Sequence, residues 1–345
     1  MLFSVLYGLC IANAVAFNGA VLRELAEQLL ALAEKQAMVV PRMVGHRLMG
    51  MSPLLTGEVA AGRAHFDRAL ALYDPTEHRP LATRFGQDVG VAILSFRSLA
   101  LWLLGYPDAA LADANHALKD AREIGQAATL MYALNNTAIF AHIHCGNYKA
   151  AKAELEELVV LANEKGAPYW KALATINKGL LLALDGNESD AIKTITSGMA
   201  AYQSTGATLY RPQHLSYLAS AYAKVGQFEE AWRCISEAMT AVETTKENWY
   251  EAEANRVAGE VALKLPEPDA AKAEAYFQRA LRLARQQQAK SWELRAAMSL
   301  ARLWRDQGNA QQARKLLAPV YGWFTEGFDT RDLKEAKALL EELAA

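Results

Sequence analysis

The sequence predicts an all-α protein, a superhelical solenoid of about eight antiparallel helix pairs. Three observations lead to this fold class. An apolar pattern typical of a buried helix face returns at nearly constant intervals along the 345 residues. A glycine stands five residues before most copies of that pattern, and no stretch shows the alternation that predicts a strand.

The repeated pattern is a ladder of three small or apolar residues, with the second four residues and the third seven residues after the first. This spacing places all three on one helix face, which predicts a buried stripe. The first positions of successive ladders differ by 40, 48, 41, 40, 40, 42 and 40 residues. The eight ladders are Leu22/Ala26/Leu29, Gly62/Phe66/Ala69, Ala110/Ala114/Ala117, Ala151/Leu155/Leu158, Ala191/Ile195/Gly198, Ala231/Ile235/Ala238, Ala273/Phe277/Ala280 and Ala313/Leu317/Val320.

In six units a glycine is expected to end the helix before the ladder, in the left-handed conformation that other residues rarely adopt. The interval of 48 residues predicts an inserted loop at 73–90. We expect residues 1–328 to form the solenoid, with a truncated or atypical first repeat, and residues 329–345 to form a C-terminal capping helix. The predicted turn residues are Gly57, Gly105, Gly146, Gly186, Gly226 and Gly308.

Composition excludes several classes of protein. With 36 basic and 38 acidic residues the formal net charge is -2, which argues against a general affinity for nucleic acid. The three cysteines, Cys10, Cys145 and Cys234, are odd in number and widely scattered, which indicates a reducing compartment such as the cytoplasm.

The apolar first twenty residues resemble a signal peptide but lack a basic residue before Arg23. The run is also short for a membrane span and is broken by Asn13 and Asn18. We expect a buried helix there and no membrane association, with a secretory signal as the alternative.

Motifs for catalysis, cofactors and metals are missing from the sequence. Residues 57–64 have the spacing of a phosphate loop, but Arg63 and Ala64 replace its lysine and hydroxyl residue. His142 and His144 are two residues apart and point to different sides of a helix, so we expect no metal site. The sequence therefore predicts a protein that is not an enzyme and needs no cofactor.

Residues 62–70, "GRAHFDRAL", and residues 273–281, "AEAYFQRAL", resemble the tetratricopeptide repeat. The resemblance implies a right-handed superhelix in which the first helix of each unit lines a concave face. Aromatic residues recur at the starts of those helices with charged residues beside them, which suits a peptide or small ligand, although packing between units is the alternative reading. We expect several of these side chains to face one shared groove and to remain partly exposed without a partner. The predicted concave-face strip is Trp170, Tyr210, Arg211, Trp249, Tyr250, Glu253, Arg256 and Trp292.

Three longer stretches, residues 69–96, 285–304 and 316–343, resemble the C-terminal repeat region of bacterial proteins that join a class III adenylate/guanylate cyclase domain to an AAA-type or STAND-type ATPase. The chain begins inside the first repeat without either domain, so we expect a fragment, a split gene or a free-standing derivative. The resemblance implies a non-catalytic signal-transduction module that binds a protein or peptide partner, such as a cyclase/ATPase module, or a small ligand. The alternative is an effector-binding domain of a MalT-like transcriptional activator.

Overall fold

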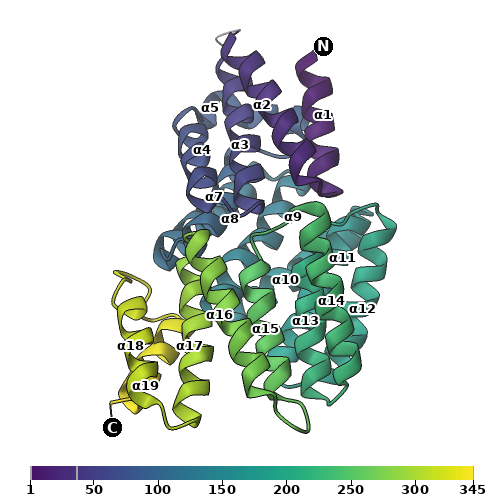
Figure 1. Ribbon diagram of the computed structural model, residues 1–345. Helices are drawn as coiled ribbons and strands as arrows, with labels where there is room; N and C mark the ends of the chain where they lie inside the picture. Colours follow the sequence, from purple (N-terminus) through teal and green to yellow (C-terminus); the bar gives the residue numbers. More distant parts are fainter. Residues whose placement is uncertain (1, 36–37, 345) are drawn as a thin grey trace.

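The structure is a computed structural model that describes residues 2–35 and 38–344 (Figure 1). Throughout those residues the regular secondary structure is helical, without a strand. Eight antiparallel helix pairs follow one another and a further helix comes last, so the predicted all-α solenoid is confirmed. None of the helices in the described part of the chain has the length and apolar character needed to cross a membrane.

Each pair consists of a helix A and a helix B, and the pairs are numbered as units 1 to 8. Units 1 to 3 are α1 (Leu2–Val15) with α2 (Gly19–Lys35), α3 (Val39–Leu55) with α4 (Val59–Ala71), and α7 (Val89–Leu103) with α8 (Pro107–Ile124). In unit 4, α9 (Ala127–Asn136) continues as the π-helical segment η2 (Thr137–Ile143) and pairs with α10 (Tyr148–Glu164). Units 5 to 8 are α11 (Pro168–Leu184) with α12 (Glu188–Ser204), α13 (Arg211–Lys224) with α14 (Phe228–Thr245), α15 (Glu251–Leu263) with α16 (Ala270–Gln286), and α17 (Lys290–Asp306) with α18 (Ala310–Tyr321).

The last helix, α19 (Arg331–Glu342), packs its apolar side, including Leu333, Ala336 and Leu339, against unit 8. It begins two residues after the predicted division at residue 329. That division of the chain stays a prediction, and its outer limits, residues 1 and 345, lie outside the described residues.

Helix B of every unit buries its ladder as predicted, from Leu22 in α2 to Val320 in α18. Small residues in the ladder let helices A and B approach closely. A Cβ atom on Gly62 would lie 2.8 Å from the carbonyl oxygen of Gly50 in α3, closer than real Cβ atoms come. The six predicted turn glycines all have positive φ, between 76° and 96°, so the turns are confirmed as well.

The insertion between units 2 and 3 differs from the predicted loop because it is helical. It forms α5 (Pro75–His78), the 3₁₀ turn η1 (Arg79–Leu81) and α6 (Ala82–Phe85). The side chain of Asp74 accepts from two amides at the start of α5, and Asp88 accepts from the Val91 amide at the start of α7. The Tyr7 hydroxyl in α1 donates to the Phe85 carbonyl at 2.8 Å, so the insertion is tied to unit 1.

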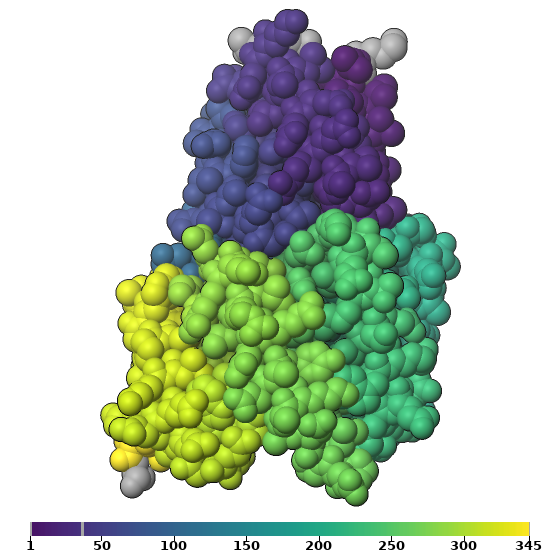
Figure 2. Space-filling view, viewed as in Figure 1, coloured from purple at the N-terminus to yellow at the C-terminus, as the bar shows by residue number. Residues whose placement is uncertain are grey.

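The superhelix coils tightly enough for each of the first units to touch the unit five places further along. Figure 1 shows the N-terminal units lying above the starts of α13 and α15. In Figure 2 the N-terminal units (purple and blue) and the later units (green) are in contact across the width of the molecule. The amide of Leu209, before α13, donates to the carbonyl of Val15 at the end of α1 at 3.2 Å. The amide of Trp249, before α15, donates to the carbonyl of Leu55 at the end of α3 at 3.1 Å.

The same relation continues for units 3 and 4. The hydroxyl of Ser291, at the start of α17, donates to the carbonyl of Trp102 in the last turn of α7. Arg331, the first residue of α19, donates to the hydroxyl of Tyr148 just after the turn of unit 4. We call these four the inter-turn contacts.

Inter-turn contacts supply hydrogen-bond donors to backbone carbonyl groups at the ends of helices. The last four carbonyl groups of an α-helix have no donor within the helix. A buried carbonyl left without a donor costs about 1–3 kcal/mol. At the ends of α1 and α3, the carbonyls of Val15 and Leu55 receive their donors from the unit five places later. The Trp102 carbonyl of α7 accepts from the Gly105 amide of its own turn as well as from Ser291.

The repeat glycines divide into two groups by their surroundings. A Cβ atom on Gly105 would lie 2.5 Å from the ring of Trp323, and one on Gly146 would lie 2.8 Å from Arg331. A Cβ atom on Gly226 would meet nothing within 4 Å. The difference arises because units 3 and 4 are covered by the next turn of the superhelix, whereas unit 6 is not.

Alanine substitutions at Gly226 and Gly105 test the inter-turn contacts. We expect Gly226→Ala to lower the free energy of unfolding by about 1 kcal/mol, because only the positive φ is unfavourable for alanine. Gly105→Ala should lower it by roughly 2–4 kcal/mol, because the added methyl group also collides with Trp323. Urea unfolding followed by circular dichroism measures both losses, and equal losses would contradict a covered Gly105.

Candidate functional site

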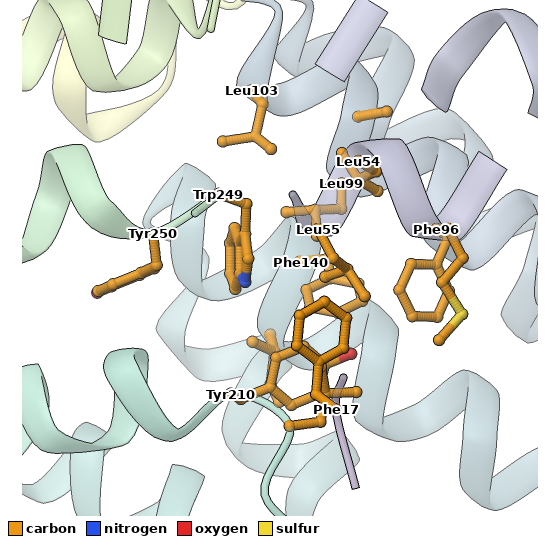
Figure 3. Close-up of a cluster of buried hydrophobic side chains, with 14 of the residues drawn as sticks. Phe17, Leu54, Leu55, Phe96, Leu99, Leu103, Phe140, Tyr210, Trp249 and Tyr250 are labelled. Carbon is orange, nitrogen blue, oxygen red and sulfur yellow. The ribbon is translucent and has the colours of Figure 1, made fainter. Parts of the chain in front are cut away.

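The middle of the superhelix is filled where its two turns meet. Figure 3 shows Phe17, Leu55, Phe140 and Tyr210 converging there, with Trp249 beside them. These five residues, the central cluster, come from units 1, 2, 4, 6 and 7 and are all buried. On either side of the cluster lies a pocket, and the two pockets share no lining residue.

The predicted aromatic strip is more buried than expected. Tyr210, Trp249, Tyr250 and Trp292 are only 4%, 0%, 4% and 1% exposed, so the expectation that they remain partly exposed is wrong. Trp170 alone among the predicted aromatics is half-buried.

The physical reason is the inter-turn contact. These aromatic residues lie at the starts of helices A, where the preceding turn of the superhelix packs against them. The Nε1 group of Trp292 donates to the Trp249 carbonyl at 3.0 Å, and its ring meets the Trp102 ring edge-on with centroids 4.7 Å apart. Their main role is therefore packing between turns.

The eight residues of the predicted strip do not share one groove. Tyr250, Glu253 and Arg256 line one pocket, whereas Trp170 and Tyr210 line the other. Trp249 and Trp292 lie between them in the core. Arg211 lines neither pocket and pairs with Glu237 on α14, with Arg211 Nη2 3.2 Å from Glu237 Oε2.

The C-terminal pocket lies among helices A of units 4 to 8 and has a volume of about 140 Å³. Four cationic side chains and one carboxylate face it, together with hydroxyl groups and the ring of His144. Figure 3 shows Tyr250, one of its wall residues, pointing away from the central cluster. Its polar and charged lining residues are His144, Tyr148, Ser216, Tyr217, Ser220, Lys224, Tyr250, Glu253, Arg256, Arg295 and Arg331.

A chain of buried ion pairs forms one wall of this pocket. Glu253 Oε2 lies 2.8 Å from Arg256 Nε, and Glu253 Oε1 lies 3.5 Å from Arg295 Nη1. Arg295 Nε lies 2.5 Å from Asp332, which also receives Arg331 Nη2 at 2.7 Å. The chain therefore joins α15, α17 and α19.

Two carboxylates of this chain remain ionised inside the protein. Burial acts to raise the pKa of Asp332, but Arg295 and Arg331 outweigh it and lower the pKa to about 2. Burial likewise opposes ionisation of Glu253, yet Arg256 and Arg295 hold its pKa below the ordinary value. Both carboxylates therefore stay negatively charged at neutral pH.

Two of the four cations, Lys224 and Arg331, are more accessible than the others, although Arg331 also pairs with Asp332. The side chains of Lys224 and Arg331 are 37% and 34% exposed. Lys224 Nζ donates to the Ala183 carbonyl at 3.0 Å and lies 3.2 Å from Glu188 at the pocket edge. These two cations are available to an incoming anionic group.

Sequence reasoning missed Arg331, Asp332 and Arg47, the last in the second pocket. Arg331 and Asp332 both belong to α19. Arg331 lines the pocket and Asp332 pairs with two of its arginines only because the superhelix begins a second turn. The sequence could have indicated Arg47, because it lies in a helix rich in apolar residues, where a buried charge is unusual.

The two histidines considered as metal ligands have other roles. His142 Nδ1 lies 3.1 Å from a Glu154 carboxylate oxygen, and the His144 ring stacks on Trp102 with centroids 4.2 Å apart. Across residues 2–35 and 38–344, the structure groups no three potential ligands in a metal-binding arrangement.

No family description and no curated protein matches this sequence. Solved structures do match it. A Rap protein complexed with competence and sporulation factor has a TM-score of 0.63 at 13% identity, over 93% of this chain and 81% of that one. The Rap conjugation gene regulator of plasmid pLS20, complexed with the Phr* peptide, has a TM-score of 0.61 at 10% identity, over 90% and 77%.

A third similar structure is aspartyl phosphate phosphatase F from Bacillus subtilis, with a TM-score of 0.53 at 17% identity over 86% of this chain and 74% of that one. The chain therefore shares the fold of proteins built from TPR-like helical repeats. At such low identities the likeness concerns the fold alone.

Glu247 is a buried acid that connects two inter-turn contacts. It is 1% exposed, and its carboxylate accepts from the Tyr210 amide at 3.0 Å and from Trp249 Nε1 at 2.9 Å. Burial raises its pKa from 4.5 to about 8, although both hydrogen bonds act in the opposite direction. The folded protein therefore holds a proton at neutral pH that the unfolded chain releases.

Because the folded state binds this proton more tightly than the unfolded chain does, the free energy of unfolding falls as the pH rises from about 4.5 to about 8. Above that range the carboxyl group is ionised in both states, and it causes no further loss. We expect Glu247→Gln, which is neutral at every pH, to be more stable than the wild type at pH 8 by about 1 kcal/mol or more. The difference should shrink towards pH 5. Thermal unfolding at several pH values measures it, with the exposed Glu243→Gln as control; a difference independent of pH would contradict a protonated Glu247.

Proposed function

We propose that this chain is a non-catalytic regulatory module that binds a peptide segment of a partner in the C-terminal pocket. The observation that supports it most is the lining of that pocket, where cations and hydroxyl groups converge inside a helical-repeat superhelix. Two proteins with a similar fold were solved in complex, one with the Phr* peptide and one with competence and sporulation factor, which supports a binding role.

The lining indicates the chemistry of the bound segment. Lys224, Arg256, Arg295 and Arg331 face the pocket with one carboxylate, Glu253, so an acidic side chain is favoured over a basic one. The volume of about 140 Å³ suits one side chain rather than a whole peptide. The remainder of the segment lies along the pocket rim, where Lys224 and Arg331 are accessible.

We further propose that the partner is a cyclase/ATPase module. The support is the resemblance of residues 285–304 and 316–343 to the repeat region of bacterial cyclase–ATPase proteins. An effector-binding domain of a MalT-like activator is the alternative. An ATPase or cyclase that binds the purified chain, and is released by an acidic peptide, would favour the first.

Lys224→Gln tests the pocket directly. We expect it to weaken binding of acidic hexapeptides by roughly five- to tenfold, because it removes an accessible cation. Hexapeptides of acidic, neutral and basic composition are compared by fluorescence anisotropy. Lys193→Gln is the matched control, since Lys193 lies on α12 with a 78% exposed side chain and lines neither pocket.

Equal losses in the two lysine variants would mean that only overall charge matters. Preferential binding of basic hexapeptides, or an unchanged affinity in Lys224→Gln, would contradict the proposed pocket.

A further inference from the structure

The N-terminal pocket lies on the other side of the central cluster, among α1, α3, α9, α11 and the segment before α13. Its volume is about 300 Å³. Its walls are mainly apolar and aromatic, with Ile11 and Met51 on one side and Trp170 and Leu173 on the other. Besides the aromatic residues Tyr169, Trp170 and Tyr210, its lining includes a small polar set: Arg47, Gln87, Tyr132, Asn135 and Asn136.

Arg47 is the one ionisable group with a permanent charge in this lining, and it is only 3% exposed. Its Nε and Nη1 atoms are buried without a hydrogen-bond partner. Among the ion pairs of the described residues, none involves Arg47. Burying a charge without a counterion is strongly unfavourable, so proteins normally pair it.

The other interior arginines show the contrast. Arg256 and Arg295 have side chains only 15% and 11% exposed, and each forms ion pairs with carboxylates. Arg47 has the same need for a counterion, and none of residues 2–35 and 38–344 supplies one at this position.

Neighbouring polar atoms in the pocket also lack partners. The Tyr132 hydroxyl, Asn135 Oδ1 and Asn136 Nδ2 are buried and make no hydrogen bond within the described residues. Arg47, Tyr132 and Asn136 can all donate hydrogen bonds, so most of the groups without a partner are donors. A carboxylate accepts several hydrogen bonds at once and matches the planar fork of an arginine.

The size of the pocket limits what can accompany the carboxylate. A volume of about 300 Å³ equals that of roughly ten water molecules at about 30 Å³ each, so it takes a ligand on the order of ten non-hydrogen atoms. Because the walls beyond Arg47 are apolar and aromatic, the remainder of such a ligand is apolar. Water alone would fill the volume without neutralising Arg47.

We propose that the N-terminal pocket binds a small organic carboxylate, with the acid group paired to Arg47 and an apolar body held between α1 and α11. The site contains none of the residues of the peptide pocket, so it stands or falls independently of the proposed function. A ligand there contacts units 1 to 5 and the segment before α13, and so links the two turns of the superhelix.

The test uses the full chain and four probes: 4-phenylbutyrate and octanoate, and the corresponding neutral amides. Titration calorimetry gives the affinity of each, and thermal unfolding gives the stabilisation. We expect both acids to bind and to raise the melting temperature by roughly 2 °C at ten times the dissociation constant, whereas the amides bind at least tenfold more weakly.

Arg47→Met keeps the volume of the side chain and removes its charge. We expect this variant to lose acid binding by tenfold or more and to unfold at a higher temperature than the ligand-free wild type, because an unpaired buried charge has been removed. Arg302→Met is the matched control on the outer side of α17, where the arginine pairs with Glu335, and it should bind the acids normally.

Several results would overturn the proposal. One is equal affinity for acids and amides, and another is acid binding that persists in Arg47→Met. A third is full stabilisation by chloride or sulfate alone, which would assign the pocket to an inorganic anion. Failure of both acids to bind the wild type at 10 mM would also count against it, and this measurement needs no variant to fold.

Discussion

A helix that ends inside a protein leaves carbonyl oxygens without donors, and in units 1 and 2 the unit five places further along supplies those donors. This relation fixes the pitch of the superhelix, since the donors of Leu209 and Trp249 meet Val15 and Leu55 only if one turn takes five units. It also explains why the interior is closed. Tyr210 and Trp249, which precede helices A, pack into the central cluster, and a pocket lies on either side of it.

The repeat could be predicted from the sequence because it rests on local spacing. Ladder residues, turn glycines and the number of helix pairs all follow from contacts within one unit or between neighbouring units. The burial of Trp249 and Trp292 could not be predicted in this way, because it depends on a turn of the superhelix whose pitch no single unit encodes. For the same reason Asp332, which links Glu253 and Arg295 to α19, could not be predicted from the spacing within one unit.

In the described part of the chain, the charged residues of the interior form two groups, those with a partner of opposite charge and those without. Around the C-terminal pocket, arginines and carboxylates alternate from α15 to α19, so removing any one side chain exposes the charge of its neighbour. Around the N-terminal pocket, a single arginine stands among aromatic and amide side chains. The same superhelix thus encloses one pocket whose arginines each have a carboxylate partner and one whose arginine has none among the described residues.

The closure between units five apart also has a consequence for how the chain folds. In an open repeat array each unit contacts only its neighbours, so folding can spread from any point. In this chain Asn248 bonds to Thr56 and Ser291 to Trp102, residues 192 and 189 positions apart. Contacts of such separation slow folding because a long loop must close first. During synthesis, units 1 to 5 therefore emerge with the inner ends of their helices uncovered, and only units 6 to 8 complete the core.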